Sequence, residues 1–266
     1  MLSNPVQTHA TSLFQASQDR SRIPALSQHE LQMDFTDAYA IQAARNVLTL
    51  DAGAEVLGWK IGFSAKPVMA LLGVEQPVYG LLTDDRVFEA GDAIPAGRLV
   101  APRLEAEIAF VMETDLRGQG CTPADVVAAT AYVSPAIELV DGRFLPADPA
   151  TGATPTALDM IADNVAFGGL IMGQEQHSLD GLDLRRIGVI AGIDDEVEET
   201  GLGASVYGDP LAAMAWLANT LAEQGETIQA GQTVLSGSLV RHFACPRGTT
   251  AWADFGDFGR LEISFE

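Results

Sequence analysis

From residue 55 to the C-terminus, the chain consists of short apolar runs separated by Gly, Pro and Asp, which is typical of short β-strands joined by turns. The runs are EVLGWKIGF, PVYGLLTDDRVF, AEIAFVME, YVSPAIELVDGR, GVIAGIDDEVEETG, TVLSGSL and RLEISF. Helical patterns interrupt them over 122–133 and 209–225 only, without the regular strand–helix alternation that a doubly wound parallel sheet requires. The sequence therefore predicts an α+β fold, with a curled mixed sheet or β-roll and peripheral helices.

The start of the chain has a different pattern. Helical patterns cover 6–20 and 34–53, with Pro24 between them. We therefore expect a helical N-terminal segment over 1–54 followed by a β-rich domain over 55–266, the two forming one functional unit. With 266 residues, of which 47% are hydrophobic, the chain is long and apolar enough to bury the hydrophobic core of one sizeable globular domain with an accessory segment.

The charge balance excludes two classes of partner. The chain has 15 Lys and Arg against 36 Asp and Glu, a formal net charge of -21, and no basic cluster. Because nucleic acids and anionic membranes attract basic surfaces, we expect neither as a partner. The sequence has no membrane-length apolar run and no secretory leader, and Cys121 and Cys245 make no disulfide framework, so we expect a cytoplasmic protein. An anionic small molecule would need local cations to bind.

Two glutamates occupy alternate positions of a run that is otherwise apolar, PRLEAEIAFV. In a strand, Glu105 and Glu107 project to the same side, about 7 Å apart at their Cα atoms. One interpretation is a solvated strand face. However, the apolar residues that follow Glu107 indicate a strand entering the core, where unpaired like charges are unfavourable and a divalent cation would offset them.

A third carboxylate has a similar setting. Glu138 lies between Ile137 and Leu139 in the run SPAIELVDGR. Three carboxylates offer the oxygen ligands that Mg²⁺ and Mn²⁺ prefer, and they leave coordination positions open for water or an oxyanionic substrate.

Six segments, in order along the chain, carry a resemblance to a known family. They are GWKIGFSAKPVMALLGVEQPVYGLL, PRLEAEIAFV, PAIELVDGR, DMIADN, GASVYGDPLAAMAWLANTLAEQG and AGQTVLSGSL. From about residue 35 onward, the chain resembles the 2-keto-4-pentenoate hydratase and 4-oxalocrotonate decarboxylase group of the fumarylacetoacetate hydrolase superfamily.

The resemblance implies a fold and a function. The fold would be a twisted mixed β-sandwich roll like that of fumarylacetoacetate hydrolase, with a helical N-terminal segment and a catalytic domain over 55–266. The function would be that of a divalent-metal-dependent lyase, a hydratase or decarboxylase of meta-cleavage-type aromatic catabolism, acting on a small anionic 2-oxo-enoic or 2-hydroxydienoic acid. The alternatives are a C–C bond hydrolase or oxo-acid tautomerase of the same superfamily, or a non-catalytic partner subunit. The resemblance also implies a homo-oligomer, and it allows a hetero-complex with a related lyase.

The resemblance also implies roles for individual residues. Glu105, Glu107 and Glu138 match the family's ligands for Mg²⁺ or Mn²⁺. Lys60, in WKIGF, matches the family lysine, which would bind the substrate carboxylate or move a proton; the alternative is a surface lysine at a strand end.

Three further polar residues are candidates for substrate binding. Asp163 and Asn164 could hydrogen-bond around the metal, or could form a turn between strands, as Asp–Asn pairs commonly do. Ser236, in LSGSL, resembles a segment that lines the family's site, although Gly–Ser turns are common.

The chain departs from the family pattern at several positions. Val78 replaces an aspartate of the hydratases, which slightly favours decarboxylation, because CO₂ loss needs chiefly an electron sink whereas water addition needs a placed acid or base. Gly142 and Val165 lie where family members carry or neighbour a serine, and the loop over 145–159 is lengthened. The identity of the substrate therefore does not follow from the resemblance.

Overall fold

The computed structural model describes residues 5–28 and 33–266, and it contains two β-sheets. The larger sheet has eight strands. In spatial order they are β2 (Val78–Thr83), β1 (Val56–Gly62), β10 (Thr233–Leu235), β5 (Arg103–Met112), β6 (Thr130–Val140), β7 (Phe167–Met172) and β3 (Val87–Phe88), with β11 (Phe243–Ala244) also pairing with β5. The smaller sheet has five, which are β4 (Ala93–Ile94), β13 (Arg260–Phe265), β12 (Thr250–Asp254), β8 (Gly188–Ile193) and β9 (Glu196–Leu202).

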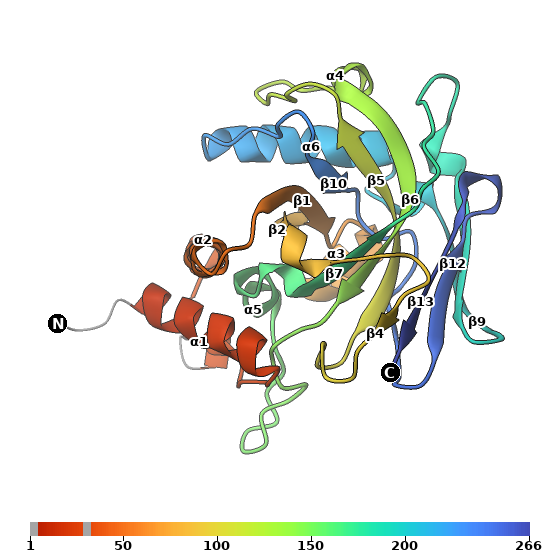
Figure 1. The fold of residues 1–266 in the computed structure, drawn as a ribbon. Helices are drawn as coiled ribbons and strands as arrows, with labels where there is room; N and C mark the ends of the chain where they lie inside the picture. The colour runs from red at the N-terminus through yellow and green to blue at the C-terminus, as the bar shows by residue number, and fades with distance from the viewer. Residues whose placement is uncertain (1–4, 29–32) are drawn as a thin grey trace.

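Six α-helices accompany the sheets in the described part of the chain. They are α1 (Pro5–Asp19), α2 (Phe35–Asp51), α3 (Lys66–Leu72), α4 (Pro123–Ala129), α5 (Ala157–Ala162) and α6 (Pro210–Glu223). Figure 1 shows α1, α2 and α5 on one side of the larger sheet, whose long strands β5 and β6 bend strongly, and the strands of the smaller sheet on the other side. Within the described residues, no helix has the length and apolar character needed to cross a bilayer.

The alternation of side chains along β5 separates the two faces of the larger sheet. Leu104, Ala106, Ile108 and Phe110 are fully buried in the main core, which also contains apolar residues of the smaller sheet. Residues at odd positions point to the opposite, concave face. On that face, Ala109 packs in a separate apolar cluster of the larger sheet. The two glutamates of β5 therefore face away from the main core, toward the helices.

The N-terminal helices are attached to the concave side. Helix α2 begins with a capping box, in which Asp37 N donates to Asp34 Oδ1 at 2.9 Å and Asp34 N donates to Asp37 Oδ2 at 3.2 Å. Further along α2, Gln42 Nε2 donates to Tyr79 O at 3.0 Å and to Ile161 O at 2.9 Å. A buried amide thus joins α2 to both β2 and α5.

The structure confirms the prediction of an α+β chain with a curled mixed sheet. The helices predicted over 6–20, 34–53 and 209–225 are α1, α2 and α6. The helix predicted over 122–133 is wrong beyond Ala129, because residues 130–133 pair with β5 as the start of β6.

Two short helices, α3 and α5, were not predicted from the sequence. Residues 157–159, expected at the end of the loop over 145–159, form the start of α5. For α3 the sequence signals were present, since Pro67 lies in its first turn and Gly73 follows it with a φ of 67°.

Candidate metal centre

The structure brings the three predicted glutamates together. Glu105 and Glu107 lie on β5, and the antiparallel register of β5 and β6 pairs Glu105 directly with Glu138. One carboxylate oxygen from each residue lies within 4.8 Å of the others. Glu107 and Glu138 are 0% exposed, and Glu105 is partly exposed. A solvated strand face therefore does not describe this cluster, because two of its three carboxylates have no contact with water.

Two oxygens of the cluster lack a donor. Glu107 Oε2 accepts a hydrogen bond of 2.7 Å from Gly237 N. Within the described residues, Glu107 Oε1 and Glu138 Oε2 have no hydrogen-bond partner. A buried carboxylate oxygen without a partner is unfavourable. Converging carboxylate oxygens are the ligands that hard divalent cations prefer, so the donor set fits Mg²⁺.

A buried cation lies beside the cluster. Lys60 Nζ, on β1, lies 2.7 Å from Glu138 Oε1, and the Lys60 side chain is 1% exposed. With all groups ionised, three carboxylates and one ammonium leave two negative charges uncompensated inside the protein. A divalent cation carries the charge that would offset them.

The electrostatics of the cluster follow from this crowding. Burial, followed by the negative charges of the neighbouring glutamates, raises the pKa of Glu107 well above its ordinary value. Burial raises the pKa of Glu138 to about 7, against the lowering effect of Lys60. Burial alone would lower the pKa of Lys60, but the surrounding carboxylates, Glu138 first, outweigh it and raise that pKa. Lys60 therefore remains an ammonium at neutral pH.

The strand register places Lys60 on the concave face. In β1, Lys60 is paired with Gly80 of β2 on one side and with Leu235 of β10 on the other. Its Nζ also donates to Val165 O at 3.4 Å. That carbonyl belongs to the short turn η3 (Asn164–Ala166), in which all three residues have a positive φ.

Asp163 lies next to this turn, and its carboxylate binds Arg143. Arg143 Nε donates to Asp163 Oδ1 at 2.7 Å, and Arg143 N donates to Asp163 Oδ2 at 2.9 Å. Both side chains are buried. Each carboxylate oxygen of Asp163 thus has a donor within the protein.

The amide of Asn164 is similarly engaged. Its Oδ1 accepts from Leu81 N at 2.7 Å, and its Nδ2 donates to Leu81 O at 2.8 Å. The side chain therefore binds the backbone of β2 through both polar atoms of its amide.

Ser236 is fully buried at the end of β10. Its backbone N donates to Ile108 O at 3.1 Å, and its Oγ donates to Gly237 O at 3.4 Å. The next residue, Gly237, supplies the backbone N–H that binds Glu107. The LSGSL segment therefore contacts the cluster through its backbone.

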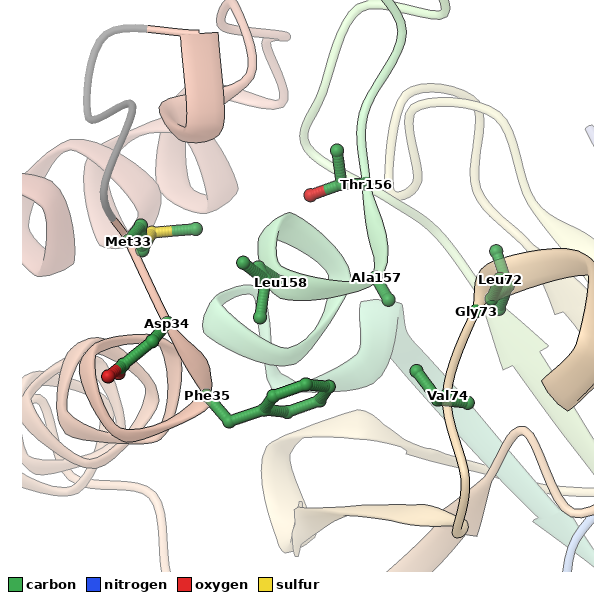
Figure 2. A pocket seen from close by; sticks show the side chains of 9 residues that line it. All are labelled: Met33, Asp34, Phe35, Leu72, Gly73, Val74, Thr156, Ala157 and Leu158. Carbon is green, nitrogen blue, oxygen red and sulfur yellow. The ribbon is translucent and has the colours of Figure 1, made fainter.

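A shallow depression of about 410 Å³ lies apart from the cluster, between the start of α2, the end of α3 and the start of α5. Figure 2 shows the ring of Phe35 reaching into it from α2, toward the loop that carries Val74. Thr156 and Leu158, where the predicted 145–159 loop meets α5, line another side. None of the four charged residues of the cluster lines this depression.

The role of the Val165 carbonyl as an acceptor for Lys60 was not predicted from the sequence. A left-handed turn is usually recognised in a sequence by Gly or Asn. Here Asn164 is followed by Val165 and Ala166, residue types that rarely adopt a positive φ. The sequence reflects this turn at two other positions, Gly62 and Gly80, where a side chain would collide with it. A Cβ on Gly62 would lie 2.5 Å from Val165 Cγ1, and a Cβ on Gly80 would lie 2.9 Å from Asn164 Oδ1.

Known proteins resemble this chain over nearly its whole length, although no protein-family model matches it. It is 39% identical over 256 residues to the 2-oxo-hept-4-ene-1,7-dioate hydratase of Escherichia coli, covering 96% of each chain. It is 35% identical over 257 residues to the 2-keto-4-pentenoate hydratase of Paraburkholderia xenovorans, covering 97% of this chain and 93% of that protein.

A solved structure is also similar over nearly the whole length of the chain. The 4-oxalocrotonate decarboxylase of Pseudomonas putida G7, complexed with magnesium and adipate, superposes with a TM-score of 0.91 at 32% sequence identity. The match covers 98% of this chain and 97% of that one. These similarities confirm the resemblance carried by the six segments, and the chain belongs to the family of the 2-keto-4-pentenoate hydratases and 4-oxalocrotonate decarboxylases.

Proposed function

We propose that the protein is a divalent-metal-dependent lyase that acts on a small 2-oxo-enoic or 2-hydroxydienoic acid. Glu105, Glu107 and Glu138 would hold the metal, with Mg²⁺ as the first candidate and Mn²⁺ as the second. The observation that carries the proposal is their convergence within 4.8 Å beside the buried Lys60. The related decarboxylase complexed with magnesium and adipate, a metal and a small dicarboxylic acid, supports it.

The bound metal would act as a Lewis acid that stabilises negative charge on the oxygens of a 2-oxo acid. Lys60 would supply a fixed positive charge beside it. Because the surrounding carboxylates raise its pKa, Lys60 carries its proton at neutral pH and can pair with the substrate carboxylate or donate a proton, but is not ready to accept one. Its charge would also attract an anion to a protein with a net charge of -21.

Decarboxylation is our favoured reaction, and Val78 is the reason. In β2, Val78 pairs with Gly62, so it is the diagonal neighbour of Lys60 on the same face. It packs in an apolar cluster with Ala38, Ile161 and Val165. Position 78 thus offers no group that could give or take a proton during water addition.

The test is a metal-dependence assay. Chelator-treated protein would be given Mg²⁺ or Mn²⁺ together with either a 2-oxo-3-enedioate or a 2-hydroxydienoate, followed by ultraviolet absorbance and CO₂ detection. Chromophore loss with CO₂ release would establish a decarboxylase, and loss without CO₂ a hydratase. C–C cleavage products or keto–enol exchange alone would establish a hydrolase or a tautomerase. Metal binding without turnover of any substrate would favour a non-catalytic partner subunit.

The proposal extends to a cytoplasmic homo-oligomer, with a hetero-complex with a related lyase as the alternative. Sedimentation velocity of the purified chain, alone and mixed with such a lyase, would distinguish the two assemblies.

A further inference from the structure

The turn beside Lys60 has an unusual backbone. Asn164, Val165 and Ala166 have φ values of 55°, 51° and 57°, so three consecutive residues other than glycine adopt the left-handed conformation. The conformation is unfavourable for each of them, and most of all for the β-branched Val165. Such a backbone persists only where the surrounding structure enforces it.

Two features of the neighbouring strands enforce this turn. The amide of Asn164 forms two hydrogen bonds with the backbone of Leu81, one as acceptor at 2.7 Å and one as donor at 2.8 Å. Gly62 and Gly80 leave the space into which Val165 and Asn164 fit, since a Cβ on either glycine would approach the turn to 2.9 Å or less. The turn is therefore locked against β1 and β2 at the level of Lys60, which pairs with Gly80.

The locked turn directs one carbonyl at the lysine. Val165 O accepts from Lys60 Nζ at 3.4 Å, while Glu138 Oε1 lies 2.7 Å from the same atom. An ammonium has three N–H donors. Two acceptors on different structural elements restrict its orientation and leave a third N–H to bind a ligand.

We propose that Asn164 is a positioning residue, which acts on the reaction through the Val165 carbonyl and the orientation of Lys60. This inference rests on the proposed function, in which Lys60 contacts the substrate. It assigns Asn164 a role different from the direct substrate contact that the sequence suggested.

A double-mutant cycle tests the inference. The probe is 2-oxopentanoate, a 2-oxo acid without a C=C bond to which the enzyme could add water, with its Kd measured by calorimetry in saturating Mg²⁺. We expect Asn164→Ala to weaken binding about tenfold in the wild type and less than about twofold in Lys60→Met. The affinity for Mg²⁺ alone should change less than about twofold, because Asn164 contacts none of the glutamates in the described hydrogen bonds. Equal losses in the two backgrounds would show a merely structural role and overturn the inference.

Asn219 offers a matched control. It also holds backbone through its amide, accepting from Cys121 N at 2.9 Å and donating to Cys121 O at 3.0 Å, but it lies on α6. Asn219→Ala should lower the Tm while leaving the Kd for 2-oxopentanoate unchanged. If Asn164→Ala does not fold, Gly80→Ala replaces it, because the added Cβ would lie 2.9 Å from Asn164 Oδ1 and would displace the amide from its hydrogen bonds. We expect a loss of about fivefold from that variant, again only when Lys60 is present.

Crystal structures give a readout that does not depend on the substrate. In whichever of these two variants folds, the Lys60 ammonium should leave its position between Glu138 and residue 165, and an unmoved ammonium would overturn the inference. Failure of the proposed function would look different, since the wild-type protein with Mg²⁺ would then not bind 2-oxopentanoate at all, whatever the position of Lys60.

Discussion

Lys60 Nζ lies 2.7 Å from Glu138 Oε1, with both side chains closed to water. The two residues come from strands that are not neighbours, because β10 and β5 lie between β1 and β6 in the sheet. Curling of the sheet brings their side chains together across its concave face. The fold thereby places a positive charge against one edge of a carboxylate cluster that otherwise carries only negative charge.

Replacing Lys60 with Met should remove most of the activity. The change deletes the ammonium but keeps an unbranched side chain in a fully buried position. We expect kcat to fall by about 10²- to 10⁴-fold, the range for losing a positioned proton donor. Calorimetry should show that Mg²⁺ still binds, because all three glutamates remain. Turnover at the wild-type rate would contradict the role proposed for Lys60.

Replacing Glu107 with Gln should have opposite effects on metal binding and on metal-free stability. Gln keeps an acceptor for Gly237 N but removes a buried negative charge. Titration calorimetry should show an affinity for Mg²⁺ at least about 100-fold lower, since even the partners of metal ligands contribute 10- to 100-fold.

In chelator at pH 8, the same Glu107→Gln protein should unfold with a free energy about 1 kcal/mol higher than the wild type, because like charges are no longer buried together. Glu113 follows β5 and is exposed, so Glu113→Gln is the matched control and should change neither quantity. A Glu107→Gln protein less stable than the wild type in chelator would show that the cluster is not under electrostatic stress.

Much of the site could be predicted from the sequence because strand periodicity is a local property. The positions of Glu105 and Glu107 on one face follow from their spacing alone, and the structure places them on that face. That Glu138 pairs with Glu105 depends on the register of two strands, in which the paired residues are more than thirty positions apart in the chain. The apolar neighbours of Glu138 and the resemblance to a family suggested that it joins the same site, but neither predicts that register.

The polar environment of the site was less predictable, because it depends on tertiary hydrogen bonds. Nothing near Asp163 in the sequence shows that its carboxylate binds Arg143, or that the amide of Asn164 binds Leu81. The predicted end of the helix over 122–133 was wrong for a similar reason. An Ala- and Val-rich stretch suits a helix locally, but pairing with β5 makes residues from Thr130 onward a strand.

The metal-free protein should lose stability as the pH rises from about 4.5 to about 7. Burial raises the pKa of Glu138 from 4.5 to about 7, and the pKa of Glu107 also rises. In this window the folded state holds a proton that the unfolded chain releases, so the free energy of unfolding falls as the pH rises. For Glu138 alone the fall amounts to at most about 3 kcal/mol.

Urea titrations in chelator between pH 5 and pH 7.5, compared with Glu138→Gln, would isolate this contribution. In chelator, the free energy of unfolding of the wild type should fall relative to that of Glu138→Gln as the pH rises. In saturating Mg²⁺ it should instead rise with pH relative to the variant, because the metal competes with protons for the carboxylates. A difference independent of pH would mean that Glu138 titrates as it does in the unfolded chain.

Replacing Arg143 with Lys should destabilise the protein although the charge is kept. The Arg143 guanidinium, 2% exposed, donates to Asp163 Oδ1 at 2.7 Å, to Asp163 O at 2.7 Å and to Phe167 O at 3.1 Å. A lysine ammonium cannot span these acceptors, because its donors diverge from a single atom. We expect a loss of about 3 kcal/mol in urea unfolding, comparable to breaking a buried ion pair. Arg185, which pairs with Asp183 at the surface, gives the control, and Arg185→Lys should cost less than about 1 kcal/mol. Equal losses from the two substitutions would mean that the geometry around Arg143 adds nothing beyond its charge.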